Sequence, residues 1–243
     1  MILQYFNIRT LIVLVLSITS CYLALRFNFK LHFDVVVFGV AVVFPLATSI
    51  QSAFKRRERS LEYLSTFKAG LTAIYFSLQT NKELAPEKLE EGRGLLLRLS
   101  DALADQLHQV NGDSQRFHVH ADAVVQYLNQ QREFLSGRIV IRIIRYLRDS
   151  LEASNFLLSL VRHRTMAGLR IYALSFINVF AIIQAPMVLY ELENQLPVWA
   201  LYFTSAFSSI ILITLYNFQQ LIEYPFDQKG ADDIDLSNFK LDI

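Results

Sequence analysis

Four long runs without any Asp, Glu, Lys or Arg dominate this sequence, two near each end of the chain. The runs are Thr10–Leu25, Val35–Phe54, Ile171–Tyr190 and Leu196–Ile222. A helix needs about 20 mostly apolar residues to cross the hydrocarbon core of a bilayer, at a rise of about 1.5 Å per residue. We therefore predict an all-α membrane protein with four transmembrane helices in two hairpins.

The composition agrees, because apolar and charged residues are both abundant and lie in separate segments. The chain is 53% hydrophobic and still 19% charged, whereas soluble domains average about 45–50% apolar and about 25% charged residues. The net charge of +1 provides no basic field of the kind that attracts nucleic acid. We expect the lipid bilayer as a partner and no nucleic acid.

Basic residues flank the long middle region and predict its side of the membrane. Lys55, Arg56, Arg57 and Arg59 follow the second run, and Arg162, Arg164 and Arg170 precede the third. Because Lys and Arg favour the cytoplasmic side, we expect the middle region and both termini in the cytoplasm. The short chain, the compact loops and the lack of a transit peptide favour a prokaryotic inner membrane. The predicted division is a transmembrane hairpin at 1–54, a cytoplasmic helical region at 55–169, a second hairpin at 170–222 and a cytoplasmic tail at 223–243.

The first run has an alternative interpretation as a secretory or lipoprotein signal. Arg9 precedes the apolar stretch, and Ile18-Thr19-Ser20-Cys21 is similar to a lipidation site. A cleaved signal is followed by a polar mature start, whereas Tyr22–Leu25 continues the apolar run. The transmembrane interpretation is therefore preferred.

The middle region has the apolar spacing of packed helices. Apolar residues recur every three or four positions from Leu61 to Leu78, which predicts a helix with one buried face. Breaks are expected at Asn81–Pro86, Gly92–Gly94, Asn111–Asp113 and Ser136–Gly137. The segment Ile139–Leu160, read as a helix, has apolar residues on more than one face. This indicates burial against other helices or subunits.

The sequence contains none of the common motifs of enzymes. No Gly-rich phosphate loop, Gly-x-Ser-x-Gly elbow or His-Glu-x-x-His pair is present, so no enzymatic activity is expected. His118 and His120 stand beside Asp122, but residues i and i+2 point to different sides of a helix. A solvated helix start is preferred there over a metal site.

One face of the second run changes from apolar to polar to basic. At steps of three and four, it carries Val40, Phe44, Thr48, Gln51, Ser52, Lys55 and Arg59. Around a central axis of several copies, this face would form an apolar neck, a polar vestibule and a cationic mouth that favours small anions. The alternative is that Val40 and Phe44 face lipid or pack, and that the cations only follow the positive-inside bias.

The end of the last run resembles the bestrophin family. Glu223, Pro225 and Phe226 follow the run directly, and an acidic stretch with Asp232, Asp233 and Asp235 comes next. The run Ser52–Arg59 and the segment His163–Thr165 are also similar to that family. The layout of two hairpins around a helical middle matches over most of the chain.

The resemblance implies a pentameric, chloride-like anion channel whose second helix lines a neck of three bulky residues. Carried over, these residues are Val40, Phe44 and Thr48, where Thr48 departs from the usual apolar side chain. Some members bind calcium with the acidic stretch, which would assign that role to Asp232, Asp233 and Asp235. A solvated acidic tail without calcium is preferred here.

The sequence therefore predicts a passive anion channel built as a homo-oligomer, which the resemblance makes a pentamer. Val40, Phe44 and Thr48 would form the neck, and Gln51, Ser52, Lys55 and Arg59 the vestibule and mouth. No cofactor is expected. The alternative function is a non-conducting membrane scaffold or signalling protein that binds a partner through its cytoplasmic helices.

Overall fold

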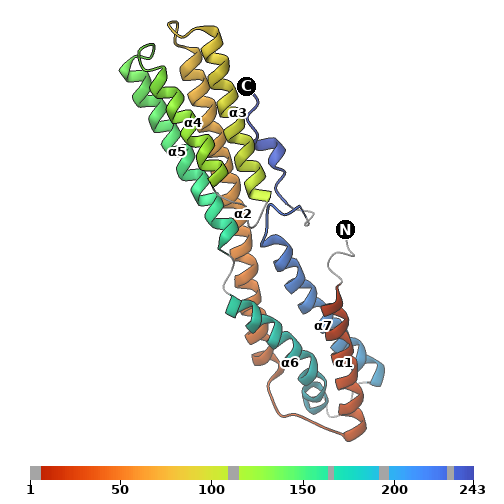
Figure 1. Cartoon of the computed structure of the whole chain (residues 1–243). Helices are drawn as coiled ribbons and strands as arrows, with labels where there is room; N and C mark the ends of the chain where they lie inside the picture. Colours follow the sequence, from red (N-terminus) through yellow and green to blue (C-terminus); the bar gives the residue numbers. More distant parts are fainter. Residues whose placement is uncertain (1–6, 109–114, 164–166, 192–196, 229–232) are drawn as a thin grey trace. The chain divides into compact units, whose positions relative to one another are not determined.

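The protein is mostly helical in the residues that the computed structural model describes, which are 7–108, 115–163, 167–191, 197–228 and 233–243. Its helices are α1 (Ile8–Phe27), α2 (Val35–Gln79), α3 (Pro86–His108), α4 (Gln115–Gln130), α5 (Gly137–Arg162), α6 (Ala167–Glu191), α7 (Val198–Ile222) and the 3-10 helix η2 (Leu236–Phe239) (Figure 1). No strand occurs among those described residues. The chain divides into two compact units, which are described separately: unit 1 contains residues 1–55 and 165–223, and unit 2 contains 56–164 and 224–243.

Unit 1 contains the membrane candidates. Four helices, α1, α2, α6 and α7, are long and apolar enough to cross a bilayer, which confirms the predicted number of spans. In unit 1, α1 packs against α6 and α7, and Val13, Val42, Ile177 and Ile213 form part of the shared core. Many other large apolar side chains of unit 1 remain exposed, as expected for a surface that faces lipid.

Pro45 breaks the backbone hydrogen-bond ladder inside α2. A proline has no N–H, so the carbonyl four residues earlier, that of Ala41, loses its helical donor. The Tyr172 hydroxyl of α6 donates to this oxygen at 3.4 Å. The neighbouring helix thus supplies the hydrogen bond that the proline removes, as is typical of membrane helices.

Pro186 has the same effect inside α6. The carbonyl without a helical donor is that of Ile182, and the Ser20 hydroxyl of α1 donates to it. The Pro186 carbonyl itself accepts a hydrogen bond from the Leu31 amide at 3.2 Å. At both prolines, a hydrogen bond to the carbonyl that lacks its helical donor therefore connects two neighbouring helices of unit 1.

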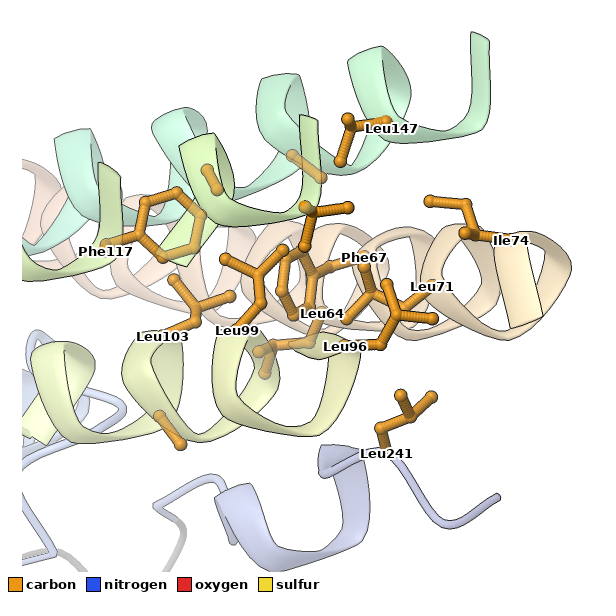
Figure 2. Packing of buried hydrophobic residues seen from close by; sticks show 14 of the residues in the cluster. Leu64, Phe67, Leu71, Ile74, Leu96, Leu99, Leu103, Phe117, Leu147 and Leu241 are labelled. Atoms are coloured by element: carbon orange, nitrogen blue, oxygen red, sulfur yellow. The ribbon is translucent and has the colours of Figure 1, made fainter. Parts of the chain in front are cut away.

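Unit 2 is a bundle formed by α3, α4, α5 and the second part of α2. Its core includes Leu71, Ile74, Leu99, Phe117 and Leu157, each no more than 1% exposed (Figure 2). The α2–α3 and α4–α5 connections meet at one end of the bundle, where the Asn81 side-chain Nδ2 donates to the Phe134 carbonyl at 2.7 Å. Consecutive helices of unit 2 therefore run in opposite directions.

Two predicted helix breaks are confirmed and one is wrong. α2 ends at Gln79 and α3 begins at Pro86, and α5 begins at Gly137, as expected. The predicted break at Gly92–Gly94 does not exist, because α3 continues through it. Gly92 instead permits close packing, since a Cβ there would lie 2.9 Å from the Tyr127 hydroxyl oxygen of α4. Asn111–Asp113 lies outside the described residues.

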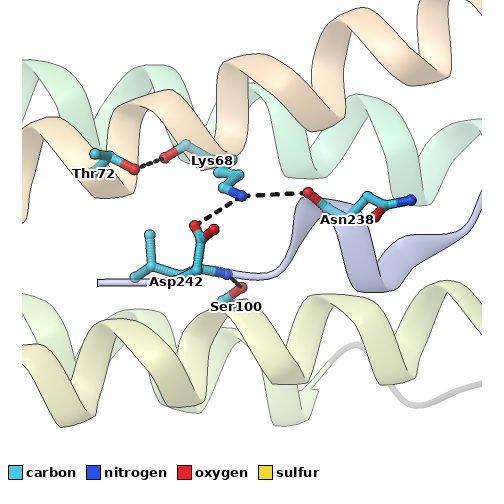
Figure 3. A network of polar contacts seen from close by, with 6 residues as sticks. Lys68, Thr72, Ser100, Asn238 and Asp242 are labelled. Carbon is cyan, nitrogen blue, oxygen red and sulfur yellow. Dashed lines mark hydrogen bonds and ion pairs between the residues drawn. The ribbon is translucent and has the colours of Figure 1, made fainter.

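The last residues of the chain belong to unit 2, where Leu236 and Leu241 join the buried core. The Lys68 ammonium contacts the Asp242 carboxylate at 2.8 Å and donates to the Asn238 carbonyl at 3.3 Å (Figure 3). The Leu241 amide donates to Ser100 Oγ at 3.1 Å. Residues 233–243 are therefore attached to α2 and α3 by both apolar and polar contacts. We call this segment the docked tail.

Candidate pore-lining site

The candidate neck residues lie on an open side of α2. Val40 is 59% and Phe44 67% exposed, and Thr48 one turn further is exposed as well. The opposite side of the helix is fully packed, with Val42 and Leu46 each 1% exposed. Within unit 1, α2 thus has a packed side and an open side, and the candidate neck residues lie on the open side.

The polar part of the predicted face continues along the same helix. Gln51, Ser52 and Lys55 are exposed in unit 1, and Arg59 is exposed in unit 2. Neither Lys55 nor Arg59 forms an ion pair with any residue in the described ranges. Both cations are therefore available to an anion.

The two hydroxyls on this face already donate to the backbone. Thr48 Oγ1 donates to the Pro45 carbonyl at 2.9 Å, and Ser52 Oγ donates to the Thr48 carbonyl at 2.8 Å. In this arrangement both hydroxyl protons are used within the helix. Gln51 and Lys55 are then the donors of the vestibule that face outward with free N–H groups.

Aromatic side chains of α6 support α2 from its packed side. Phe38 of α2 stacks on Phe180 at 5.9 Å and on Phe176 at 6.0 Å between ring centroids, and Tyr172 stacks on Phe176 at 4.2 Å. These aromatic residues are not among the predicted site residues. The signal was present, because Tyr172, Phe176 and Phe180 recur every four positions and so share one helix face.

The Glu-x-Pro-Phe motif is divided between the two units. Glu223 is the C-cap of α7 in unit 1, is 1% exposed and accepts from Gln219 Nε2 at 3.4 Å. Phe226 belongs to the buried core of unit 2, where its carbonyl lies 3.1 Å from His108 Nδ1. The Pro225 carbonyl accepts from the Ile234 amide at 2.7 Å. The motif is thus largely buried and structural.

The acidic stretch lies only partly within the described residues. Asp232 lies outside them. Asp235 accepts hydrogen bonds from the Ser237 amide at 2.9 Å and from Asn238 Nδ2 at 3.4 Å, so it caps η2, and the bond to Ser237 lowers its pKa. Asp233 is half-buried, and no group of three or more His, Cys, Asp or Glu side chains is placed to hold a metal within the described ranges. The assignment of calcium to Asp232, Asp233 and Asp235, and the preference for a solvated acidic tail, both stay predictions.

The histidines have structural positions. His118 is exposed and His120 half-buried on α4, where two residues apart they point in different directions. His163 is the C-cap of α5, and its carbonyl accepts from Arg56 Nη1 at 2.9 Å. Among the described residues, none of these three histidines lies in a group of three or more side chains that could hold a metal ion.

Four apolar helices and a helical bundle define a helical membrane protein. Its fold is that of bacterial bestrophin homologues. Three crystal structures of such a homologue from Klebsiella pneumoniae, one of them phased with zinc and two of them single-residue variants, match with TM-scores of 0.77, 0.78 and 0.80. Each is 15% identical, and the match covers 95% of this chain and 92–93% of the other.

Comparison of the sequence alone finds no similar protein. No family model matches the chain, and no curated protein matches it. The likeness in fold confirms the resemblance to bestrophins that the sequence motifs predict.

Proposed function

We propose that the protein is a passive anion channel, formed by several copies of the chain with α2 at the centre. Val40, Phe44 and Thr48 form the neck, and Gln51, Ser52, Lys55 and Arg59 form the vestibule and inner mouth. Apolar constrictions control flux by excluding water, and rings of Lys and Arg favour anions. The bestrophin-like fold supports this function, and we propose a ring of five copies, as the family resemblance of the sequence implies.

One observation carries the proposal. Val40 and Phe44 are 59% and 67% exposed in a single chain, while Val42 and Leu46 behind them are fully buried. The same exposed face continues through Thr48, Gln51 and Ser52, whose polar side chains make it a poor lipid surface. A water-filled path along the copies of α2 accommodates the whole face.

The test is chloride efflux from liposomes that contain the purified protein. Phe44→Ala removes the largest side chain of the neck, so we expect efflux to rise by about tenfold or more, since a wider neck is more readily wetted. Phe203→Ala is the matched control, because Phe203 is 62% exposed on α7 but outside the proposed pore. It should leave efflux unchanged.

Other outcomes separate the alternatives. Equal efflux from wild type and Phe44→Ala would keep a channel but move its constriction away from α2. No efflux from either protein, when both are folded and oligomeric, would contradict conduction and favour the membrane scaffold. The helices of unit 2 would then be the place to search for a bound partner.

A further inference from the structure

A row of arginines covers the outer side of α5 and is not explained by the packing of one chain. Arg138, Arg142, Arg145 and Arg148 are all exposed, and Ile141 among them is 64% exposed. These five residues are called the α5 basic face. Arg148 pairs with its neighbour Asp149 at 2.8 Å, whereas the other three arginines form no ion pair with any described residue.

Such a face is unfavourable when it is left open. Like charges three or four positions apart on a helix repel one another, and an exposed isoleucine gains nothing from burial. Arginine is also the cation that protein interfaces use most, because its planar head pairs with two carboxylate oxygens at once. The α5 basic face therefore has the composition of a contact surface.

The outer side of α3 carries the complementary charge. Glu87, Glu90 and Glu91 are exposed in its first turns, and these three residues are called the α3 acidic face. Glu90 and Glu91 reach Arg93 and Lys88 at 2.8 and 2.9 Å. Exposed carboxylates retain free oxygen lone pairs after one such contact, so they can also accept from a second cation.

The two faces lie at the same level of the bundle. α3 begins at Pro86 and α5 at Gly137, directly after the two connections that the Asn81–Phe134 hydrogen bond holds together. Glu87 and Arg138 are thus both in the first turn of their helices, and Glu90 and Arg142 are in the second.

The two faces also lie on different sides of unit 2. Figure 1 shows α5 and α3 at its two flanks, with α4 between them in that view. α3 packs mainly against α4 and also contacts α5 through its inner side, and the Tyr127 hydroxyl of α4 donates to the Lys88 carbonyl of α3 at 2.6 Å. α5 packs against α2, where Phe156 stacks on Tyr63 at 3.9 Å.

We propose that the α5 basic face of one copy docks on the α3 acidic face of the next copy. This inference rests on the proposed function, because it assumes a ring of identical chains. Rotation about an axis along the bundle keeps every residue at its level, so head-to-tail contacts join surfaces of equal height. Opposite charges at equal height on opposite flanks meet this requirement and set the order of the ring.

The experiment reverses the charges and then restores them. Arg138→Glu with Arg142→Glu places like charges opposite the α3 acidic face. We expect the ratio of oligomer to monomer, measured by native mass spectrometry at fixed concentration, to fall by about tenfold or more. Glu87→Lys with Glu90→Lys should have the same effect, and all four changes in one chain should return the ratio to near the wild-type value.

The matched control is Arg116→Glu with Arg132→Glu. Both arginines are exposed, on α4 and just after it, and the change in net charge is the same. This variant should assemble like wild type. Circular dichroism of every variant should show the same helical content as wild type.

The outcomes distinguish two failures. A wild-type protein that is monomeric at all concentrations would overturn the docking and the oligomeric channel together. An oligomeric wild type whose charge-reversed variants assemble equally well would overturn the docking alone. Loss of assembly that the four-residue exchange does not restore would also overturn it, because α5 would then contact a surface other than α3.

Discussion

At the scale of single residues, hydroxyl groups decide how unit 1 tolerates two prolines. Ser20 and Tyr172 donate to the carbonyls of Ile182 and Ala41, the oxygens that lose their helical donors. An unpaired carbonyl in an apolar surrounding costs free energy that a cross-helix hydroxyl avoids. The Ser20 hydroxyl thus holds α1 against α6 at one position along their lengths, and the Tyr172 hydroxyl does the same for α6 and α2.

Ser20→Ala should destabilise the protein. The change leaves the Ile182 carbonyl, in a part-buried contact, without this donor, so we expect the free energy of unfolding to fall by about 1 kcal/mol. Unfolding in mixed detergent, followed by circular dichroism, measures the difference.

Ser17→Ala is the matched control in the same helix. Ser17 is 0% exposed, and its hydroxyl has no hydrogen-bond partner in the described part of the chain. Removing it should change the free energy of unfolding by well under about 1 kcal/mol. Equal losses in both variants would mean that Ser20 contributes packing alone.

At the scale of elements, the docked tail shows how charge and burial act together. Lys68 lowers the pKa of Asp242 from its ordinary value of 3.8. Asp101 raises the pKa of Lys240 from 10.5, and their charged groups lie 2.8 Å apart. A carboxylate with a lowered pKa stabilises the docked state above its ordinary pKa, and an amine with a raised pKa does so below its own.

Acid should therefore loosen the docked tail. As pH falls below 3.8 toward the lowered value, Asp242 gains a proton and its attraction to Lys68 is lost. We expect the protection of the Leu241 amide against hydrogen exchange, corrected for the intrinsic rate, to be lower at about pH 3 than at about pH 7. The effect should be modest, because the ion pair is largely exposed.

Asp242→Asn identifies the group that titrates. The variant keeps the shape of the side chain without its charge, so its Leu241 amide should be less protected than in wild type at about pH 7, and the difference between the two pH values should shrink. An unchanged difference would assign the pH dependence to another carboxylate.

α2 shows what helical periodicity can and cannot predict. The spacing of three and four places Val40, Phe44 and Thr48 on one face whatever the surroundings, since the period is that of the backbone. The spacing does not say which face packs. That depends on Val13 and Ile177, which share a core with Val42 and Leu46 and come from distant parts of the sequence.

At the scale of the whole molecule, the chain passes between its two units at 55–56, 164–165 and 223–224. The basic clusters at Lys55–Arg59 and Arg162–Arg170 lie at two of these passages. The positive-inside rule then predicts that unit 2 is cytoplasmic and that the α6–α7 connection faces the other side.

Cysteine labelling tests this orientation. In a Cys21→Ala background, Lys82→Cys lies in the α2–α3 connection of unit 2 and Val198→Cys at the start of α7. Both native residues are exposed. In intact cells, a membrane-impermeant maleimide should label the cysteine at 198 and reach the one at 82 only after the membrane is opened. The reverse pattern would contradict the predicted orientation.

The sequence by itself determined the four apolar helices, because a run of about 20 uncharged residues has few stable alternatives to a membrane helix. It also determined the face on which the candidate pore residues lie, because the helical period is local. Only the tertiary structure decided that this face stays unpacked, that Tyr172 and Ser20 complete the hydrogen bonds missing at two prolines, and that residues 233–243 join the core of unit 2. These features depend on contacts between residues far apart in the chain, and such contacts leave no periodic trace in the sequence.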